Sequence, residues 1–222
     1  IGIVANQTTV IFKPKGYTHL VDSLLNLNIN VKKVFAPEHG FRGTADAGEY
    51  VKDGIDAGSG IPIVSLYGVN KIPNAAILSD LDIVIFDVQD VGARFYTFLS
   101  TLHYMMETCA NLGITVLVLD RPNPNGHYVD GPTLDLKYPS FVGVHPVPVV
   151  HGMTVGEYAQ MINGEGWLKQ GVKCDLKVIS LQNYTHSTTY QLPINPSPNL
   201  PNSKSINLYP SLCFFEGTNM SM

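Results

Sequence analysis

Carboxylate side chains follow two of the apolar runs in this 222-residue sequence, at the points where the runs end. Asp87 and Asp90 come after the run at 83–86, and Glu38 follows the run at 31–35 on a turn stiffened by proline. Two carboxylates on either side of a reacting bond can divide the work of hydrolysis, one giving a proton and the other acting as base or nucleophile. We therefore expect Glu38 to be a general acid and Asp87 or Asp90 to be its partner.

The same residues also have structural readings, which the sequence leaves open. Glu38 could accept hydrogen bonds from the backbone N–H groups of its own turn. Asp87 and Asp90 could form ion pairs with Arg94, seven and four positions further on, and so shape the loop that follows the strand. The types and spacing of these residues are compatible with both readings.

A second polar cluster follows the apolar run at 115–119. Arg121 could bind a ligand carboxylate with its planar guanidinium while Asp120 binds ligand hydroxyls, or the two could form a structural salt bridge. Glu157 is assigned to a helix cap, because Thr154 precedes it at the spacing of a capping box. Further candidates lie in Gly- or Pro-rich loops expected at the same edge: His39, Arg42, His151, Asn199 and Glu216.

Strand-like and helix-like segments alternate along the chain, which predicts right-handed βαβ units, a parallel sheet and an α/β fold. Ligands of such sheets bind beyond the carboxyl ends of the strands, where the polar clusters fall. In the helix expected at 100–111, we expect Gly113 to end the helix and His103 and Glu107 to lie on its solvated face. The expected strands are 1–4, 31–35, 61–66, 83–86, 115–119, 147–150 and 176–181, and the other expected helices are 18–26, 74–80 and 154–163.

Composition excludes several classes of partner. The formal net charge is −4 and no basic stripe is present, so we do not expect nucleic acid to bind. No apolar run reaches the length of a membrane span. The three cysteines do not form a disulfide framework, and no nucleotide-binding or zinc-binding motif occurs, so we predict neither a cofactor nor a metal.

The two ends of the sequence suggest a fragment. Residue 1 is Ile within a strand-like run, and the last residues have the composition of a loop. We expect an α/β domain at 1–205 and, at 206–222, the beginning of a smaller C-terminal subdomain that is truncated. The sequence makes no prediction about the oligomeric state.

Taken together, nine motifs in a fixed order resemble those of the exo-β-N-acetylmuramidases. The resemblance extends over nearly the whole chain. It rests on ANQT at 5–8, FAPEHGFRG at 35–43, SLYG at 65–68, FDVQDVGARFYT at 86–97, LDRPNP at 119–124, SFVG at 140–143, HGMTVGE at 151–157, PSPN at 196–199 and FEGTN at 215–219.

The resemblance implies a Rossmann-like domain with a smaller second domain, and a glycoside hydrolase that releases N-acetylmuramic acid from the non-reducing end of peptidoglycan fragments. A periplasmic or extracellular location follows from that substrate. The residues it points to are Glu38, His39, Asp87, Asp90, Arg94, Asp120, Arg121, Asn199 and Glu216.

Within this reading Arg94 or Arg121 would bind the lactyl carboxylate of the substrate, since a planar fork suits a carboxylate. Glu216 is a further candidate for the second carboxylate, after Asp87 and Asp90. Two other functions remain open: a non-catalytic module that binds cell-wall sugars, and a metal-dependent hydrolase or deacetylase that uses His39 with Asp87 and Asp90.

Overall fold

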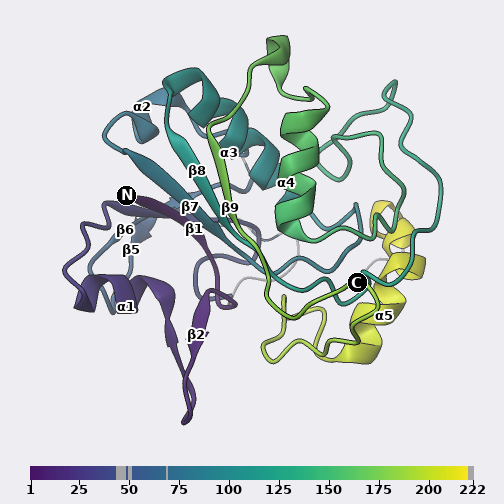
Figure 1. Cartoon of the computed structure of the whole chain (residues 1–222), viewed down its shortest axis with the longest axis horizontal. Helices are drawn as coiled ribbons and strands as arrows, with labels where there is room; N and C mark the ends of the chain where they lie inside the picture. The colour runs from purple at the N-terminus through teal and green to yellow at the C-terminus, as the bar shows by residue number, and fades with distance from the viewer. Residues whose placement is uncertain (44–48, 50–51, 69, 220–222) are drawn as a thin grey trace.

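A seven-stranded sheet forms the centre of the computed structural model, which describes residues 1–43, 49, 52–68 and 70–219 (Figure 1). Its spatial order is β5-β6-β4-β1-β7-β8-β9, and every neighbouring pair is parallel except β5 with β6. The strands are β1 (Gly2–Ala5), β4 (Lys33–Ala36), β5 (Gly54–Ile55), β6 (Pro62–Ser65), β7 (Ile83–Asp87), β8 (Thr115–Leu119) and β9 (Leu176–Ile179).

The six parallel strands, numbered in chain order, lie in the order 3-2-1-4-5-6, which is the doubly wound arrangement of Rossmann folds. The chain changes direction across the sheet between β1 and β7, so the crevice for a ligand is expected beyond their carboxyl ends. The prediction of an α/β fold with a parallel sheet is confirmed.

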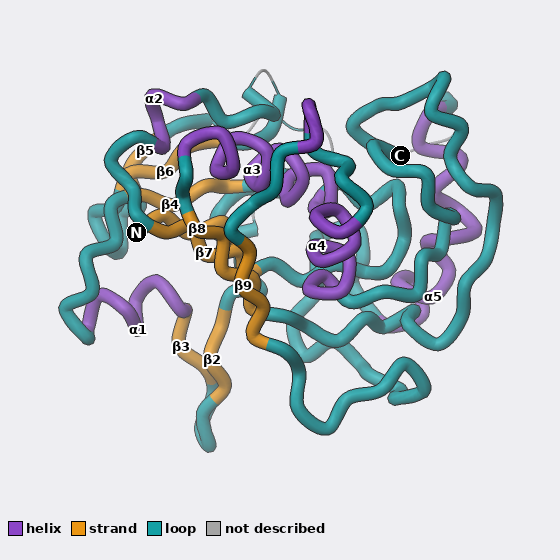
Figure 2. Tube along the Cα trace, turned by 45° about the horizontal axis from the view of Figure 1, so that its top comes forward, coloured by secondary structure: helices purple, strands orange, loops and turns teal. Residues whose placement is uncertain are grey.

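Helices cover both faces of the sheet, because successive residues of its buried strands point to opposite sides. Ile3 and Val34 pack with Val21 of α1 (Leu20–Asn26), whereas Val4 and Phe35 belong to the core beneath α3 (Phe98–Leu112). Figure 2 shows α1 across the sheet from α2 (Ala75–Leu78) and α3. Continuous apolar runs therefore mark these strands.

Helix α3 ends at Gly113 as expected, with φ of 68° at that residue. The expectation that His103 and Glu107 are solvated is wrong, since they are only 4% and 6% exposed. Helix α4 (Val155–Gly164) packs against α3, so the face of α3 turned away from the sheet is covered as well. His103 Nδ1 lies 2.9 Å from Nε2 of His145, and this pair is buried inside the interface.

The strand expected at 147–150 does not form. Pro146 and Pro148 lack the N–H groups that a sheet ladder requires, so the segment runs as a buried loop. Val150 makes only isolated bridges, to Ala93 and to Asp130. The run is apolar because Val147, Val149 and Val150 are in the core, and periodicity alone does not distinguish that from a strand.

Several elements were not expected from the sequence, among them the short edge strand β5. An antiparallel hairpin, β2 (Val10–Phe12) with β3 (Tyr17–His19), precedes α1, which therefore begins two residues later than expected. Helix α5 (Ser203–Leu212) follows the Pro-rich segment and continues into the 3-10 turn η2 (Cys213–Gly217). A second 3-10 turn, η1 (Lys169–Gly171), precedes β9.

Helix α5 crosses the domain boundary expected after residue 205, and Ile206 in that helix is 2% exposed within the main core. The division into two domains stays a prediction. In the described part of the chain, no helix is both long and apolar enough to cross a membrane.

Candidate active site

A cavity of about 940 Å³ opens where the segments after β4, β6 and β7 meet α5 and η2. It lies beyond the carboxyl ends of these parallel strands, where the fold places ligands. Its lining includes two carboxylates, an imidazole and three tyrosines. The lining residues are Glu38, His39, Tyr67, Phe95, Tyr96, Thr97, Val142, Ser197, Asn199, Leu200, Asn202, Lys204, Ser205, Leu208, Tyr209, Leu212, Phe215 and Glu216.

Glu38 and His39 lie on a tight turn directly after β4. The N–H of Gly40 donates to the carbonyl of Pro37 over 3.0 Å, which closes the turn. His39 has φ of 69°, a left-handed conformation that is unfavourable for a residue with a Cβ and that is found preferentially at functional sites. Glu38 Oε2 accepts a hydrogen bond of 2.7 Å from the hydroxyl of Thr97, the N-cap residue of α3.

Glu216 comes to the same cavity from the far end of the chain, on η2. Burial raises the pKa of Glu216, the charge of Glu38 raises it further, and a hydrogen bond with the Tyr209 hydroxyl opposes the rise. Burial and the charge and hydrogen bond of Glu38 raise the pKa of Tyr67 in turn. The two carboxylates are thus electrostatically coupled, each with a tyrosine beside it.

Asp87 is not one of the described residues that line this cavity. Its carboxylate Oδ1 accepts a hydrogen bond of 2.7 Å from Nε of Arg121 and forms an ion pair of 2.7 Å with Nη2 of the same residue. The side chains of Asp87 and Arg121 are 4% and 16% exposed. Burial raises the pKa of Asp87, and the charge of Arg121 opposes that rise. Arg121, one of the two arginines expected to bind a substrate carboxylate, is thus bonded to a carboxylate of the protein.

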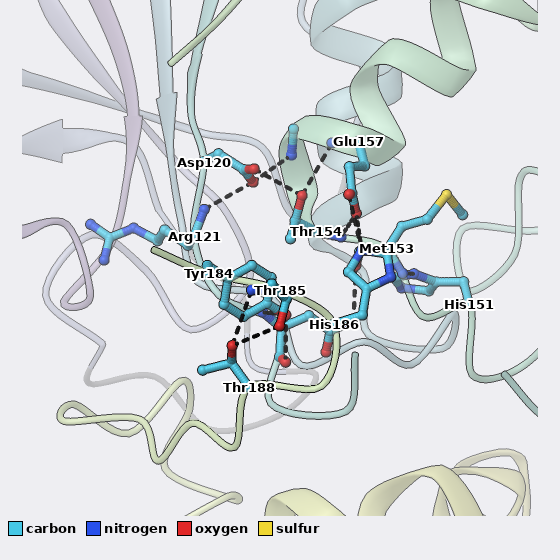
Figure 3. A network of polar contacts seen from close by, with 12 residues as sticks. Asp120, Arg121, His151, Met153, Thr154, Glu157, Tyr184, Thr185, His186 and Thr188 are labelled. Carbon is cyan, nitrogen blue, oxygen red and sulfur yellow. Dashed lines mark hydrogen bonds and ion pairs between the residues drawn. The ribbon is translucent and has the colours of Figure 1, made fainter. Parts of the chain in front are cut away.

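Asp120 holds the start of α4 (Figure 3). Its Oδ2 accepts from the hydroxyl of Thr154 over 2.8 Å, and its Oδ1 accepts from the N–H of Gly156 over 2.7 Å. The side chain of Arg121 points away from this network. The expected capping box between Thr154 and Glu157 is confirmed, and Glu157 also bonds His186 over 2.9 Å. The N–H groups of Thr154, Gly156 and Glu157, three of those left without a partner at the helix start, are satisfied in this way.

Asp90, Arg94 and His151 are buried away from the lining of the cavity. Asp90 Oδ2 accepts from the N–H of Gly92 over 2.6 Å and lies 3.7 Å from Nε2 of His151. Arg94 is 8% exposed, and its Nη2 reaches only the carbonyl of Pro132, at 3.5 Å. This arrangement supports the loop after β7.

Arg42 is also bonded within the protein. Its Nη2 and Nε donate to the two oxygens of Asp56 over 2.7 Å and 3.1 Å. These bonds lower the pKa of Asp56 to about 2. The site residues expected from sequence thus separate into a group at the cavity, with Glu38, His39, Asn199 and Glu216, and a group that does not line it. Their roles in chemistry stay predictions.

Sequence reasoning did not select Tyr67, Tyr96, Tyr209 and Lys204, which also line the cavity. Tyr67 lies two residues after the end of β6, so the rule that located Glu38 could have found it, whereas Tyr96 lies nine residues after the end of β7. Tyr209 and Lys204 lie on the unexpected helix α5 and gave no such signal. In the described residues, no group of three or more His, Cys, Asp and Glu side chains is arranged to hold a metal ion.

Comparison with known proteins decides the family. The sequence model described as "Exo-beta-N-acetylmuramidase NamZ, N-terminal" matches residues 1–204. The chain belongs to the exo-β-N-acetylmuramidase family. It is 41% identical to the "Peptidoglycan beta-N-acetylmuramidase NamZ" of Bacillus subtilis, over 100% of this chain and 53% of that protein.

Two crystal structures of DUF1343 family proteins from Bacteroides fragilis have the same fold. One is 52% identical with a TM-score of 0.86, covering 98% of this chain and 56% of that chain. The other is 33% identical with a TM-score of 0.86, covering 97% and 54%. The chain spans about half the length of these relatives.

Proposed function

We propose that this chain carries the acid/base site of a glycoside hydrolase that releases N-acetylmuramic acid from the non-reducing end of peptidoglycan fragments. The observation that carries the proposal is the pairing of Glu38 and Glu216 across one cavity of about 940 Å³, large enough for a sugar substrate. The Bacillus subtilis relative, named for this activity, supports the choice of substrate. Action on peptidoglycan implies a periplasmic or extracellular location.

The roles of the two carboxylates follow from their surroundings. A general acid must hold its proton near neutral pH, and burial together with the Glu38 charge raises the pKa of Glu216. Glu38 accepts a hydrogen bond from Thr97, which suits a carboxylate that acts as base, nucleophile or stabiliser. We therefore assign the acid to Glu216 and the partner role to Glu38, the reverse of the expectation from sequence.

Aryl muramides with leaving groups of different acidity test this assignment. A Glu216→Gln variant should hydrolyse a good leaving group at near the normal rate and fail on a sugar leaving group, because only the latter needs a proton. A Glu38→Gln variant should fail on both. The opposite pattern would show that Glu38 is the general acid.

Lys204 is the cation available to bind the lactyl carboxylate. Among the described residues that line the cavity, no other is a lysine or an arginine. Lys204 lies on α5 and is exposed, so its ammonium can reach a bound anion without a desolvation cost. We expect Lys204→Met to raise KM about 2- to 5-fold for muramides, in line with an exposed ion pair. KM for the matched glucosaminides, which lack the lactyl group, should not change.

The first test is release of N-acetylmuramic acid from a short muramyl-glucosamine fragment by the full-length protein, with and without a chelator. Turnover that survives the chelator supports the carboxylate mechanism. Loss of turnover with the chelator would favour a metal-dependent hydrolase. Binding of the fragment without turnover would favour a sugar-binding module.

A further inference from the structure

We propose that Gln7 is a positioning residue, whose side-chain amide holds the segment 195–200 so that Asn199 can bind the amino sugar in the cavity. The proposal rests on the glycosidase function proposed above, and Gln7 is not among the described residues that line the cavity. Gln7 belongs to the ANQT motif and lies two residues after the end of β1. That position is next to the point where the chain changes direction across the sheet, between β1 and β7.

The segment 195–200 depends on other parts of the chain for its position. It belongs to the connection at 180–202 between β9 and α5, which contains neither a helix nor a strand. Pro196 and Pro198 also remove two of its N–H groups. Ser197 and Asn199 nevertheless line the cavity, and a connection of this length in a compact domain is usually functional when it is ordered.

Gln7 holds this segment directly. Its Nε2 donates hydrogen bonds to the carbonyl of Asn195 over 3.0 Å and to the carbonyl of Pro196 over 2.9 Å. These two acceptors fix the orientation of the amide, because a flipped amide would place its oxygen against two carbonyl oxygens. The amide of Gln7 therefore fastens the backbone directly before Ser197.

The turns at 38–43, which carry Glu38, pack against Gln7 as well. A Cβ on Gly43 would lie 2.4 Å from Cδ of Gln7, so the backbone at Gly43 approaches the amide more closely than a side chain would allow. Gly43 also has φ of 69°, a conformation that favours glycine. Gln7 is thus packed between two parts of the chain that line the same cavity, the turn of Glu38 and the segment 195–200.

Asn199 lies between two fixed points. Gln7 holds the backbone before it, and Leu200 after it is 5% exposed within the main core. The N–H of Leu200 donates to the carbonyl of Ser197 over 3.2 Å, which closes a turn around Asn199. The side-chain amide of Asn199 is exposed and forms no hydrogen bond with the described part of the chain, so it can offer both a donor and an acceptor to a sugar.

The first part of the test needs no substrate and compares Gln7→Met with Gln160→Met in the full-length protein. Methionine keeps the length of the side chain and removes the amide. Gln160 is exposed on α4, so it is a matched control for that change. Hydrogen exchange at 197–200 should become at least about 3-fold faster in Gln7→Met, with β7 unchanged, and should not change in Gln160→Met. Unchanged exchange at 197–200, or faster exchange throughout the sheet, would overturn the proposal.

Kinetics then show whether the position of the segment serves the substrate. We expect Gln7→Met to raise KM for a muramyl-glucosamine fragment by about 3- to 10-fold, the effect of one lost neutral hydrogen bond, and to change kcat by less than about 2-fold. In an Asn199→Ala background the same change should have no further effect on KM, because the contact is already lost. Unchanged KM in Gln7→Met, or a rise that persists in that background, would overturn the proposal.

Calorimetry separates this proposal from the hydrolase function if the wild type shows no turnover. The four proteins of the same cycle are then titrated with N-acetylmuramic acid. Weaker binding by Gln7→Met that disappears in the Asn199→Ala background would support the role of Gln7 while the hydrolase function falls. Equal binding by Gln7→Met and the wild type, or no binding by either, would overturn both.

Discussion

Replacing Arg121 by Ala should destabilise the protein strongly, because it leaves the buried carboxylate of Asp87 without its partner. The Asp87 side chain is 4% exposed, and Arg121 supplies both a hydrogen bond and an ion pair to its carboxylate. Removing one member of such a buried pair costs about 3–5 kcal/mol. For a chain of this size each kcal/mol corresponds to about 2–4 °C, so the unfolding midpoint should fall by roughly 6–20 °C.

The loss should depend on pH with a defined sign. Burial already raises the pKa of Asp87 in the folded state, and Arg121 is the group that opposes the rise. Without Arg121 that pKa rises further, so the folded variant binds a proton more tightly than the unfolded chain does. The unfolding free energy of the variant should therefore recover as pH falls through the raised pKa, and the deficit should be largest at neutral and higher pH.

Urea unfolding at several pH values measures both effects, and Lys32→Ala is the matched control. Lys32 forms an ion pair of 3.9 Å with Asp80, and these side chains are 43% and 44% exposed. Such an exposed pair contributes at most about 1 kcal/mol. A deficit in Arg121→Ala no larger than that of Lys32→Ala, or one that grows as pH falls, would refute the reasoning.

Three further perturbations test other parts of the account. Tyr209→Phe removes the hydroxyl that lowers the pKa of Glu216. The limb of the pH–rate profile that reports Glu216 should therefore move to higher pH. A limb that does not move would show that Glu216 takes no part in the reaction. Asp120→Ala removes the carboxylate that accepts hydrogen bonds from Thr154 and Gly156 at the start of α4. Urea titrations should show an unfolding free energy lower by about 2–3 kcal/mol. A change below about 0.5 kcal/mol would contradict the capping role. Burial lowers the pKa of His145 to about 3. The unfolded chain therefore takes up a proton near the ordinary histidine pKa of about 6.5, while the folded chain does not, and the unfolding free energy should fall as the pH drops from about 6.5 toward 3. A shallower dependence on pH in His145→Gln would assign that loss to this residue.

The sheet and the location of Glu38 could be predicted from sequence because both depend on local pattern. Six of the seven expected strands form, and Glu38 comes shortly after one of them, β4. Helix α5 was missed because Pro210 lies inside it and its first turn is rich in Ser and Asn, residues typical of loops. The strand predicted at 147–150 was wrong, because a buried loop can be as apolar as a strand.

The partner of Glu38 could not be predicted, because sequence does not show which other carboxylate approaches it. Asp87, Asp120 and Glu216 all looked alike as acidic residues in polar clusters. Their environments differ through contacts made by distant parts of the chain: Arg121 for Asp87, Thr154 for Asp120 and Tyr209 for Glu216. Burial and partner, which decide whether a carboxylate is structural or available to a ligand, are properties of the tertiary structure.

The most direct test of the central claim, that Glu38 and Glu216 form the acid/base pair, is the rate of N-acetylmuramic acid release by three single variants. Glu38→Gln and Glu216→Gln should each lower kcat on a muramyl-glucosamine fragment by roughly 100-fold or more, as expected for loss of a general acid or base. Glu165→Gln, which changes an exposed carboxylate at the end of α4, should leave kcat unchanged. Wild-type kcat in either cavity variant, with the fold intact by circular dichroism, would contradict the account.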